Sequence, residues 1–110
     1  MMNDELREKY RVPSQNLVYL CVKENDETVL QGMGKTLNIS ESGIQLETGF
    51  AIDAKKIITL SIGVEEDIVE IQGKIIYSAE KDGKYEFGIG FLDVDERSRI
   101  IINQYVRLFQ

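Results

Sequence analysis

Three cationic side chains lie close together near the N-terminus of an otherwise acidic chain. Arg7, Lys9 and Arg11 fall within five residues, and the two arginines are four residues apart. At this spacing both arginines share one face of a helix, and in an extended arm they can still fold around one ligand. The planar guanidinium makes bidentate contacts with phosphate or with guanine O6 and N7, and it stacks on bases. The spacing therefore indicates either a site for an anionic nucleotide or two solvated side chains near a frayed terminus.

A second polar motif, residues 38–43 with the sequence NISESG, has the composition of a turn. The side chains of Asn38 and Ser40 can present hydrogen-bonding groups to a ligand. Gly43 is expected to supply a special backbone geometry, and we expect a residue at positive φ in this turn. Taken alone, the motif is equally well explained as a simple turn.

The composition disfavours most enzyme chemistry. The 110 residues contain no histidine, and the single cysteine cannot form an intramolecular disulfide or a zinc cluster. We therefore expect no enzymatic activity, no metal and no cofactor. Nineteen acidic against thirteen basic residues give a net charge of -6, which disfavours binding to duplex nucleic acid or to anionic membranes. An anionic ligand would have to be met by a local cluster of cations.

The sequence GMGKT at residues 32–36 invites a phosphate-loop interpretation, which we reject. That loop requires a further glycine at the position where this chain has Val29. The residues that follow have the pattern of strand and turn, whereas a nucleotide-binding loop opens a helix.

Runs of alternating or apolar residues recur at short spacing and are separated by clusters of Gly, Asn, Asp and Ser. This pattern is typical of an all-β barrel or sandwich. The Asp82-Gly83 pair predicts a hairpin, and Gly88 and Gly90 suit a barrel corner, a bulge or the close approach of another element. We predict strands at residues 17–23, 28–37, 43–48, 57–64, 68–77 and 84–92.

The C-terminal segment changes to a helical period. Asp95 predicts the N-cap of a helix over residues 95–109. Its apolar residues share one face: Ile101, Ile102, Tyr105, Val106, Leu108 and Phe109. We expect the helix to cap the barrel; the alternative is that it also forms a homodimer interface. The chain has neither a secretory signal pattern nor a long apolar run, so we expect a cytoplasmic protein without membrane insertion.

The two motifs, in this order and on this strand pattern, resemble the PilZ domain, a bacterial receptor domain for cyclic di-GMP. PilZ domains carry an Arg-x-x-x-Arg motif, matched by Arg7 and Arg11, and an Asp/Asn-x-Ser-x-x-Gly motif, matched by Asn38, Ser40 and Gly43. The resemblance implies a mainly β single domain over residues 1–110. It would comprise a flexible N-terminal arm (1–13), a six-stranded antiparallel β-barrel of the split-barrel type (17–92) and a C-terminal α-helix (95–109).

The resemblance also implies a role for each motif residue. Arg7 and Arg11 would close over the ligand from the arm and contact phosphate and guanine, with Lys9 and Tyr10 in secondary roles. Tyr10 would either pack the arm against the barrel or stack on a base.

The second motif would hold a guanine base. Asn38 and Ser40 would contact a guanine edge, and Gly43 would let the backbone turn tightly beside it. An aspartate in place of Asn38 could accept from guanine N1–H and N2–H together, whereas an amide has only one acceptor oxygen. We therefore expect weaker binding than an aspartate would give.

The implied function is that of a cyclic di-GMP receptor that regulates motility, adhesion or biofilm formation through an unidentified protein partner. Ordering of the arm on ligand binding would present a new surface to that partner. The alternative is a PilZ-type adaptor, for example in pilus or motility assembly, that does not bind nucleotide. The intact motifs favour the receptor.

Overall fold

Seven strands and one helix make up the part of the chain that the computed structural model describes, residues 11–53 and 56–109. The strands are β1 (Val12–Pro13), β2 (Leu17–Glu24), β3 (Glu27–Ile39), β4 (Gly43–Thr48), β5 (Ile57–Val64), β6 (Asp67–Lys81) and β7 (Lys84–Asp93). The helix, α2, spans Glu96–Arg107. All six strands predicted from the sequence are present, and the longest of them, β6, runs four residues further than residue 77, where we expected it to end.

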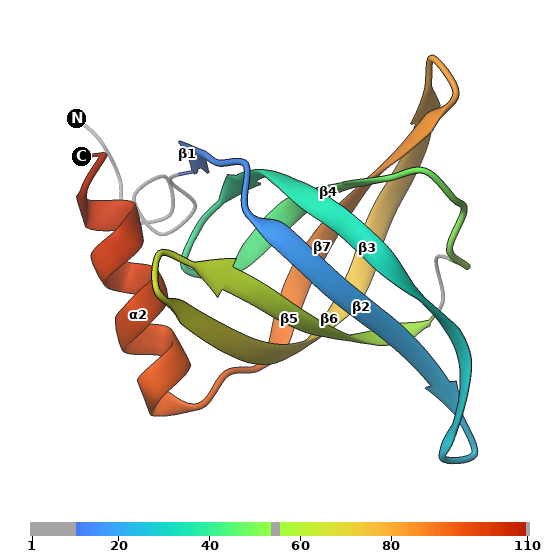
Figure 1. The fold of residues 1–110 in the computed structure, drawn as a ribbon, viewed down its shortest axis with the longest axis horizontal. Helices are drawn as coiled ribbons and strands as arrows, with labels where there is room; N and C mark the ends of the chain where they lie inside the picture. The colour runs from blue at the N-terminus through green and yellow to red at the C-terminus, as the bar shows by residue number, and fades with distance from the viewer. Residues whose placement is uncertain (1–10, 54–55, 110) are drawn as a thin grey trace.

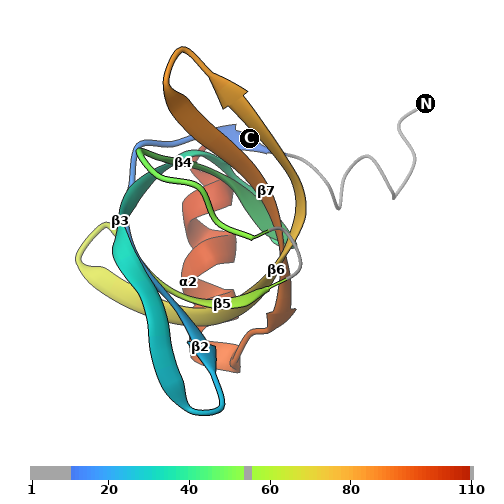
Figure 2. The ribbon, with the colours of Figure 1, turned by 90° about the vertical axis from the view of Figure 1, so that its right-hand side faces the viewer.

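The strands close into a barrel. Neighbours pair antiparallel in the order β3-β2-β5-β6-β7-β4, and β4 pairs back to β3, which confirms the predicted six-stranded antiparallel barrel. Figure 2 looks along the barrel and shows α2 lying across its far end. The short strand β1 is an addition: Val12 and Pro13, the last described residues of the expected arm, pair with Ile39 and Asn38 at the end of β3.

Tight turns join the two strands of the β2–β3 and β6–β7 hairpins. Asp82 and Gly83 both have positive φ, as the two central residues of a type I′ turn require, so the hairpin predicted between β6 and β7 is confirmed. Asn25 and Asp26 make the same kind of turn between β2 and β3. Asparagine and aspartate tolerate this backbone region because their short side chains can hydrogen-bond locally.

The core lies inside the barrel. Alternate residues of the strands point inward, as the period of two dictates, and each fully buried aliphatic side chain contributes roughly 1.5–3 kcal/mol. Among the most deeply buried side chains of the strands are Val18, Leu20, Ile39, Ile44, Leu46, Ile58, Leu60, Ile62, Ile71, Phe87 and Ile89.

The helix covers one open end of the barrel, beside β5 and β6 (Figure 1). Ile102 and Val106 are buried against the core, which confirms the predicted capping role. The predicted apolar face extends too far, however, because α2 ends at Arg107 and Leu108 is 67% exposed. No helix in residues 11–53 and 56–109 is long and apolar enough to cross a membrane.

The start of α2 is set by Asp95, as the sequence predicted. Its carboxylate accepts a 2.7 Å hydrogen bond from the backbone N–H of Ser98, one of the free donors of the first helical turn. This hydrogen bond holds the pKa of Asp95 below its ordinary value, because it favours the ionised form.

The lowered pKa of Asp95 predicts a pH-dependent contribution to stability. An aspartate whose pKa is lower in the folded state stabilises the fold above the pKa of the unfolded chain, about 4, and loses that contribution as the pH falls through the folded-state value. Asp95→Asn keeps a capping oxygen but does not titrate. We expect wild type to exceed Asp95→Asn in free energy of unfolding at pH 7, with the gap shrinking below pH ~4 in urea titrations. A gap that is the same at pH 7 and at pH 3 would contradict this expectation.

Candidate ligand-binding site

The two sequence motifs meet at the outer surface of the barrel. The guanidinium of Arg11 donates a 2.7 Å hydrogen bond to Oδ1 of Asn38, 27 residues further along the chain. The contact is possible because β1 pairs with the end of β3 and brings Arg11 beside the start of the second motif. Arg7, Lys9 and Tyr10 lie outside the described residues.

The residues after Arg11 are firmly anchored. Val12 is fully buried, and the backbone N–H of Ser14 donates to the carbonyl of Leu37 at 3.1 Å. The hydroxyl groups of Ser14 and Thr36 share a hydrogen bond in the barrel wall. The backbone at Arg11 is therefore held by the anchored residues Val12 and Ser14 on its C-terminal side.

A bulge in β3 turns Asn38 to the outside. Thr36 pairs with Leu46 and Asn38 pairs with Gln45, so β3 has one residue more than β4 at this point. In a regular strand without this bulge, Asn38 would share the inward face of Thr36, which is completely buried. With it, Asn38 lies half-buried on the outer surface, beside Arg11.

Ser40 holds the turn that follows. Its side chain is completely buried, and its Oγ accepts hydrogen bonds from the backbone N–H groups of Gly43, at 3.2 Å, and Ser42, at 3.3 Å. The backbone N–H of Ser40 donates to the carbonyl of Gly43 at 2.8 Å. No residue of this turn has a positive φ, so our expectation of one was wrong. The serine hydroxyl shapes the turn instead.

Gly43 is required by close packing. A Cβ atom at this position would lie 2.2 Å from the carbonyl oxygen of Ile89 on β7, far inside van der Waals contact. Gly43 pairs with Gly90, so β4 and β7 approach each other at two positions that have no side chain. Glycine is therefore required at position 43 for lack of space, and not for the special backbone geometry that we expected.

Two further polar residues join the site, and sequence reasoning missed both. Asn38 Nδ2 donates to Gln45 Oε1 at 2.6 Å, and Gln45 Nε2 donates to Glu86 Oε1 at 2.9 Å. The sequence pattern could have placed Gln45 on the outer surface, because it lies between Ile44 and Leu46 of β4, which point inward. Its partners depend on strand pairing. The result is a row of hydrogen bonds that runs from Arg11, just before β1, through Asn38 on β3 and Gln45 on β4 to Glu86 on β7.

Lysines surround the glutamates at the end of this row. Glu86 lies 3.6 Å from Lys81, and Glu47 lies 3.6 Å from Lys35 and 3.7 Å from Lys84. Lys35 is thus part of an ion-pair cluster on the barrel wall. Residues 32–36 lie within β3, with no helix after them, which agrees with our rejection of a phosphate loop.

An apolar wall lies on the next strand. The ring of Tyr77 covers Gly88, where a Cβ atom would lie 2.1 Å from the ring, and Gly88 pairs with Gln45. The alternation along residues 68–77 predicts Tyr77 on the core face of its strand, but a bulge between Ile75 and Tyr77 leaves it 48% exposed. Gly88 therefore serves the close approach of another element, one of the roles that we expected of it.

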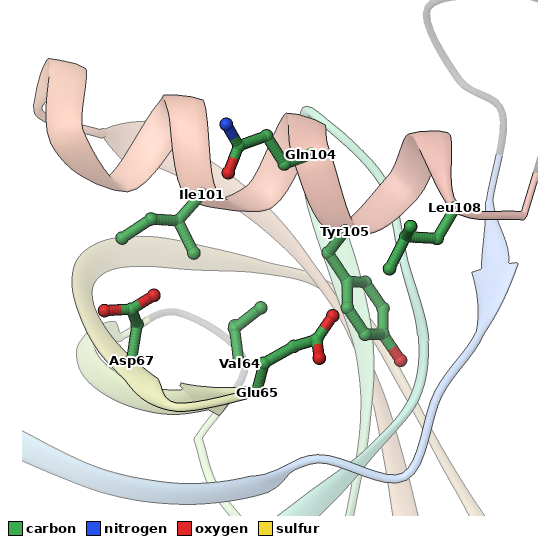
Figure 3. Close-up of a pocket in the computed structure, with 7 residues that line it drawn as sticks. All are labelled: Val64, Glu65, Asp67, Ile101, Gln104, Tyr105 and Leu108. Carbon is green, nitrogen blue, oxygen red and sulfur yellow. The ribbon is translucent and has the colours of Figure 1, made fainter.

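A separate hollow of about 270 Å³ lies between α2 and the β5–β6 hairpin (Figure 3). Two acidic residues, Glu65 and Asp67, line it together with Tyr105. Burial, together with the nearby Glu65, raises the pKa of the Tyr105 hydroxyl. Because carboxylates repel phosphates, this hollow is a poor site for an anionic nucleotide.

Comparison with known proteins agrees with this geometry. The family model for the PilZ domain matches residues 5–108. The chain belongs to the PilZ domain family. This family comprises cyclic di-GMP receptor and adaptor domains. No curated protein matches the chain by sequence.

Solved PilZ structures share the fold at low sequence identity. The inhibitor of motility MotI/DgrA of Bacillus subtilis has a TM-score of 0.76 and 16% identity over 91% of this chain, which spans about half (49%) of that protein. The PilZ domain of CeSA from a cellulose-synthesizing bacterium gives 0.65 and 13%, with 92% of this chain and 98% of that one covered. PlzA of Borreliella burgdorferi, solved in complex with c-di-GMP, gives 0.57 and 17%, with 96% and 38% covered.

The packing at Gly43 predicts a large and local loss of stability. We expect Gly43→Ala to lower the free energy of unfolding by roughly 2–3 kcal/mol, because the backbone of β7 must move to admit a methyl group. Gly49→Ala is the matched control, since a Cβ atom there meets nothing within 4 Å. Urea unfolding followed by circular dichroism measures both. Equal stability of the two variants would contradict the steric role of Gly43.

Proposed function

We propose that this chain is a cyclic di-GMP receptor whose ligand lies on the outer barrel surface, between the N-terminal arm and the 38–43 turn. The observation that carries the proposal is the hydrogen bond between Arg11 and Asn38, which brings the two motifs of the family together in one place. A chain with a net charge of -6 must attract a dianion by local cations, and the N-terminal motif contains three.

The hydrogen bonds of the described residues indicate how the ligand would bind. Arg11 now satisfies Oδ1 of Asn38, and a guanine edge can replace it by donating N–H groups to that oxygen. Arg11 would then turn to a phosphate or to guanine O6 and N7, with Arg7 as the second arginine. Ser40 and Gly43 would support this arrangement by holding the turn, because the Ser40 hydroxyl is already engaged by the backbone. Lys9 and Tyr10 would assist from the arm.

We further propose that ligand binding orders the arm and thereby transmits the signal to a protein partner. Support comes from the residues that follow the arm, because they connect it to both the barrel and the helix. Ser14 shares a hydrogen bond with Thr36 in the barrel wall, and its side chain also influences the hydroxyl of Tyr105 on α2, whose pKa it lowers. Through these contacts, a change at Arg11 would reach the helix that covers the barrel end. We propose a receptor without enzymatic activity that acts in the cytoplasm.

Calorimetric titration with cyclic di-GMP tests the proposal, with GTP and cyclic di-AMP as comparison ligands. We expect binding of cyclic di-GMP alone, and we expect Arg7→Ala and Arg11→Ala each to weaken it by at least about a hundredfold, because each removes a charge-assisted bidentate contact. Lys35→Ala is the control, since Lys35 pairs with Glu47 on the barrel wall.

Two results would contradict the proposal. An absence of heat at high micromolar cyclic di-GMP would rule out the receptor and favour an adaptor that does not bind nucleotide. An effect of Lys35→Ala as large as that of Arg11→Ala would move the site to the lysine cluster.

A further inference from the structure

The row of side chains from Arg11 to Glu86 has a defined direction. One end is a guanidinium, which only donates hydrogen bonds, and the other end is a carboxylate, which only accepts them. The two residues between them, Asn38 and Gln45, carry amides that can donate from nitrogen or accept at oxygen. Each amide could therefore point either way in isolation.

The carboxylate of Glu86 removes that freedom. Because Glu86 can only accept, Gln45 must turn its NH₂ group toward it, at 2.9 Å. The oxygen of Gln45 then faces Asn38 and must receive its NH₂ group, at 2.6 Å. The oxygen of Asn38 is left pointing outward, where Arg11 reaches it at 2.7 Å. All three contacts have the same direction.

An outward oxygen at position 38 is what a guanine edge requires, since guanine presents N1–H and N2–H donors there. We propose that Glu86 is a positioning residue that acts through Gln45 to fix the amide of Asn38 with its acceptor toward the ligand. This inference rests on the proposed function for its ligand, whereas the direction of the amides stands on the described contacts. With its amide held in this direction, Asn38 presents an acceptor oxygen to the ligand, as an aspartate would.

The charges around Glu86 support a specific role. Glu86 pairs directly with Glu47 across β4 and β7, and like charges in that arrangement destabilise a sheet. A lysine at position 86 would remove the repulsion and pair with Glu47. The side chain of Glu86 is only 14% exposed, with Lys81 at 3.6 Å, so it lies within the row rather than in solvent.

A comparison of Glu86→Lys with Glu47→Lys separates the effect of the amide direction on binding from the effect of the charge change. Glu86→Lys places a donor at the end of the row, so Gln45 must reverse and Asn38 must turn its NH₂ group outward toward Arg11 and the ligand. Glu47→Lys is the control, because it makes the same charge change at the opposite position and creates the same Lys–Glu pair; it removes the ion pairs of Glu47 with Lys35 and Lys84, whereas Glu86→Lys removes the one with Lys81. We expect Glu86→Lys to bind cyclic di-GMP about tenfold more weakly than Glu47→Lys, because a donor replaces the acceptor facing guanine.

In an Asn38→Asp background, we expect Glu86→Lys to have the opposite effect on the affinity for cyclic di-GMP. The carboxylate that Asn38→Asp introduces accepts from Gln45 only if Gln45 is reversed, and a reversed Gln45 suits a lysine at position 86 and opposes a glutamate. We therefore expect Glu86→Lys to strengthen binding when residue 38 is aspartate and to weaken it when residue 38 is asparagine. A through-space attraction of the dianion would strengthen binding in both backgrounds. The same sign in both would overturn the positioning role.

Thermal unfolding of the ligand-free variants tests the direction of the amides without the nucleotide. We expect Glu86→Lys to melt below Glu47→Lys when residue 38 is asparagine and above it in the Asn38→Asp background. If this reversal occurs but wild type gives no heat with cyclic di-GMP, the proposed function fails while the direction of the row stands. If wild type binds but neither reversal occurs, the positioning role of Glu86 fails and the receptor stands.

Discussion

The pairing of β4 with both β3 and β7 is the constraint on which the barrel and the candidate site depend. It closes the sheet, so that β4 has no free edge, and it places residues from the start, middle and end of the chain in one row. The close approach at Gly43 and Gly90 allows this pairing, because a side chain at Gly43 would meet the backbone of β7. The hydrogen bonds from Asn38 to Gln45 and from Gln45 to Glu86 follow from it.

In the proposed function, the N-terminal arm would complete a site whose other half is already held in place by the barrel. The turn after β3 is held by the buried hydroxyl of Ser40, and the chain after Arg11 is held by Val12 and Ser14. A preorganised surface reduces the ordering cost of binding, so the arm would bear most of that cost. In such an arrangement, affinity depends on the arm, and specificity depends on which groups the barrel presents. The direction of the Asn38 amide would therefore affect specificity.

Much of the fold was predictable, and the errors have local causes. The six strands, the hairpin at Asp82 and Gly83 and the cap at Asp95 follow from side-chain period and turn chemistry, which act over a few residues. Tyr77 was assigned to the wrong face because a bulge shifts the alternation. The positive φ expected in the 38–43 turn is absent, because turn composition reports a tight backbone and not which interaction makes it tight.

The sequence by itself determined the identity of the elements, the local charge cluster and the two motifs that indicate the family. Only the tertiary structure decided that Arg11 meets Asn38, that Ser40 is buried and that Gln45 and Glu86 complete the row. The physical reason is the bulge between Thr36 and Asn38, together with closure of the barrel. One extra residue turns Asn38 from the core to the surface, and strand partners are chosen by pairings between distant residues that no local pattern records.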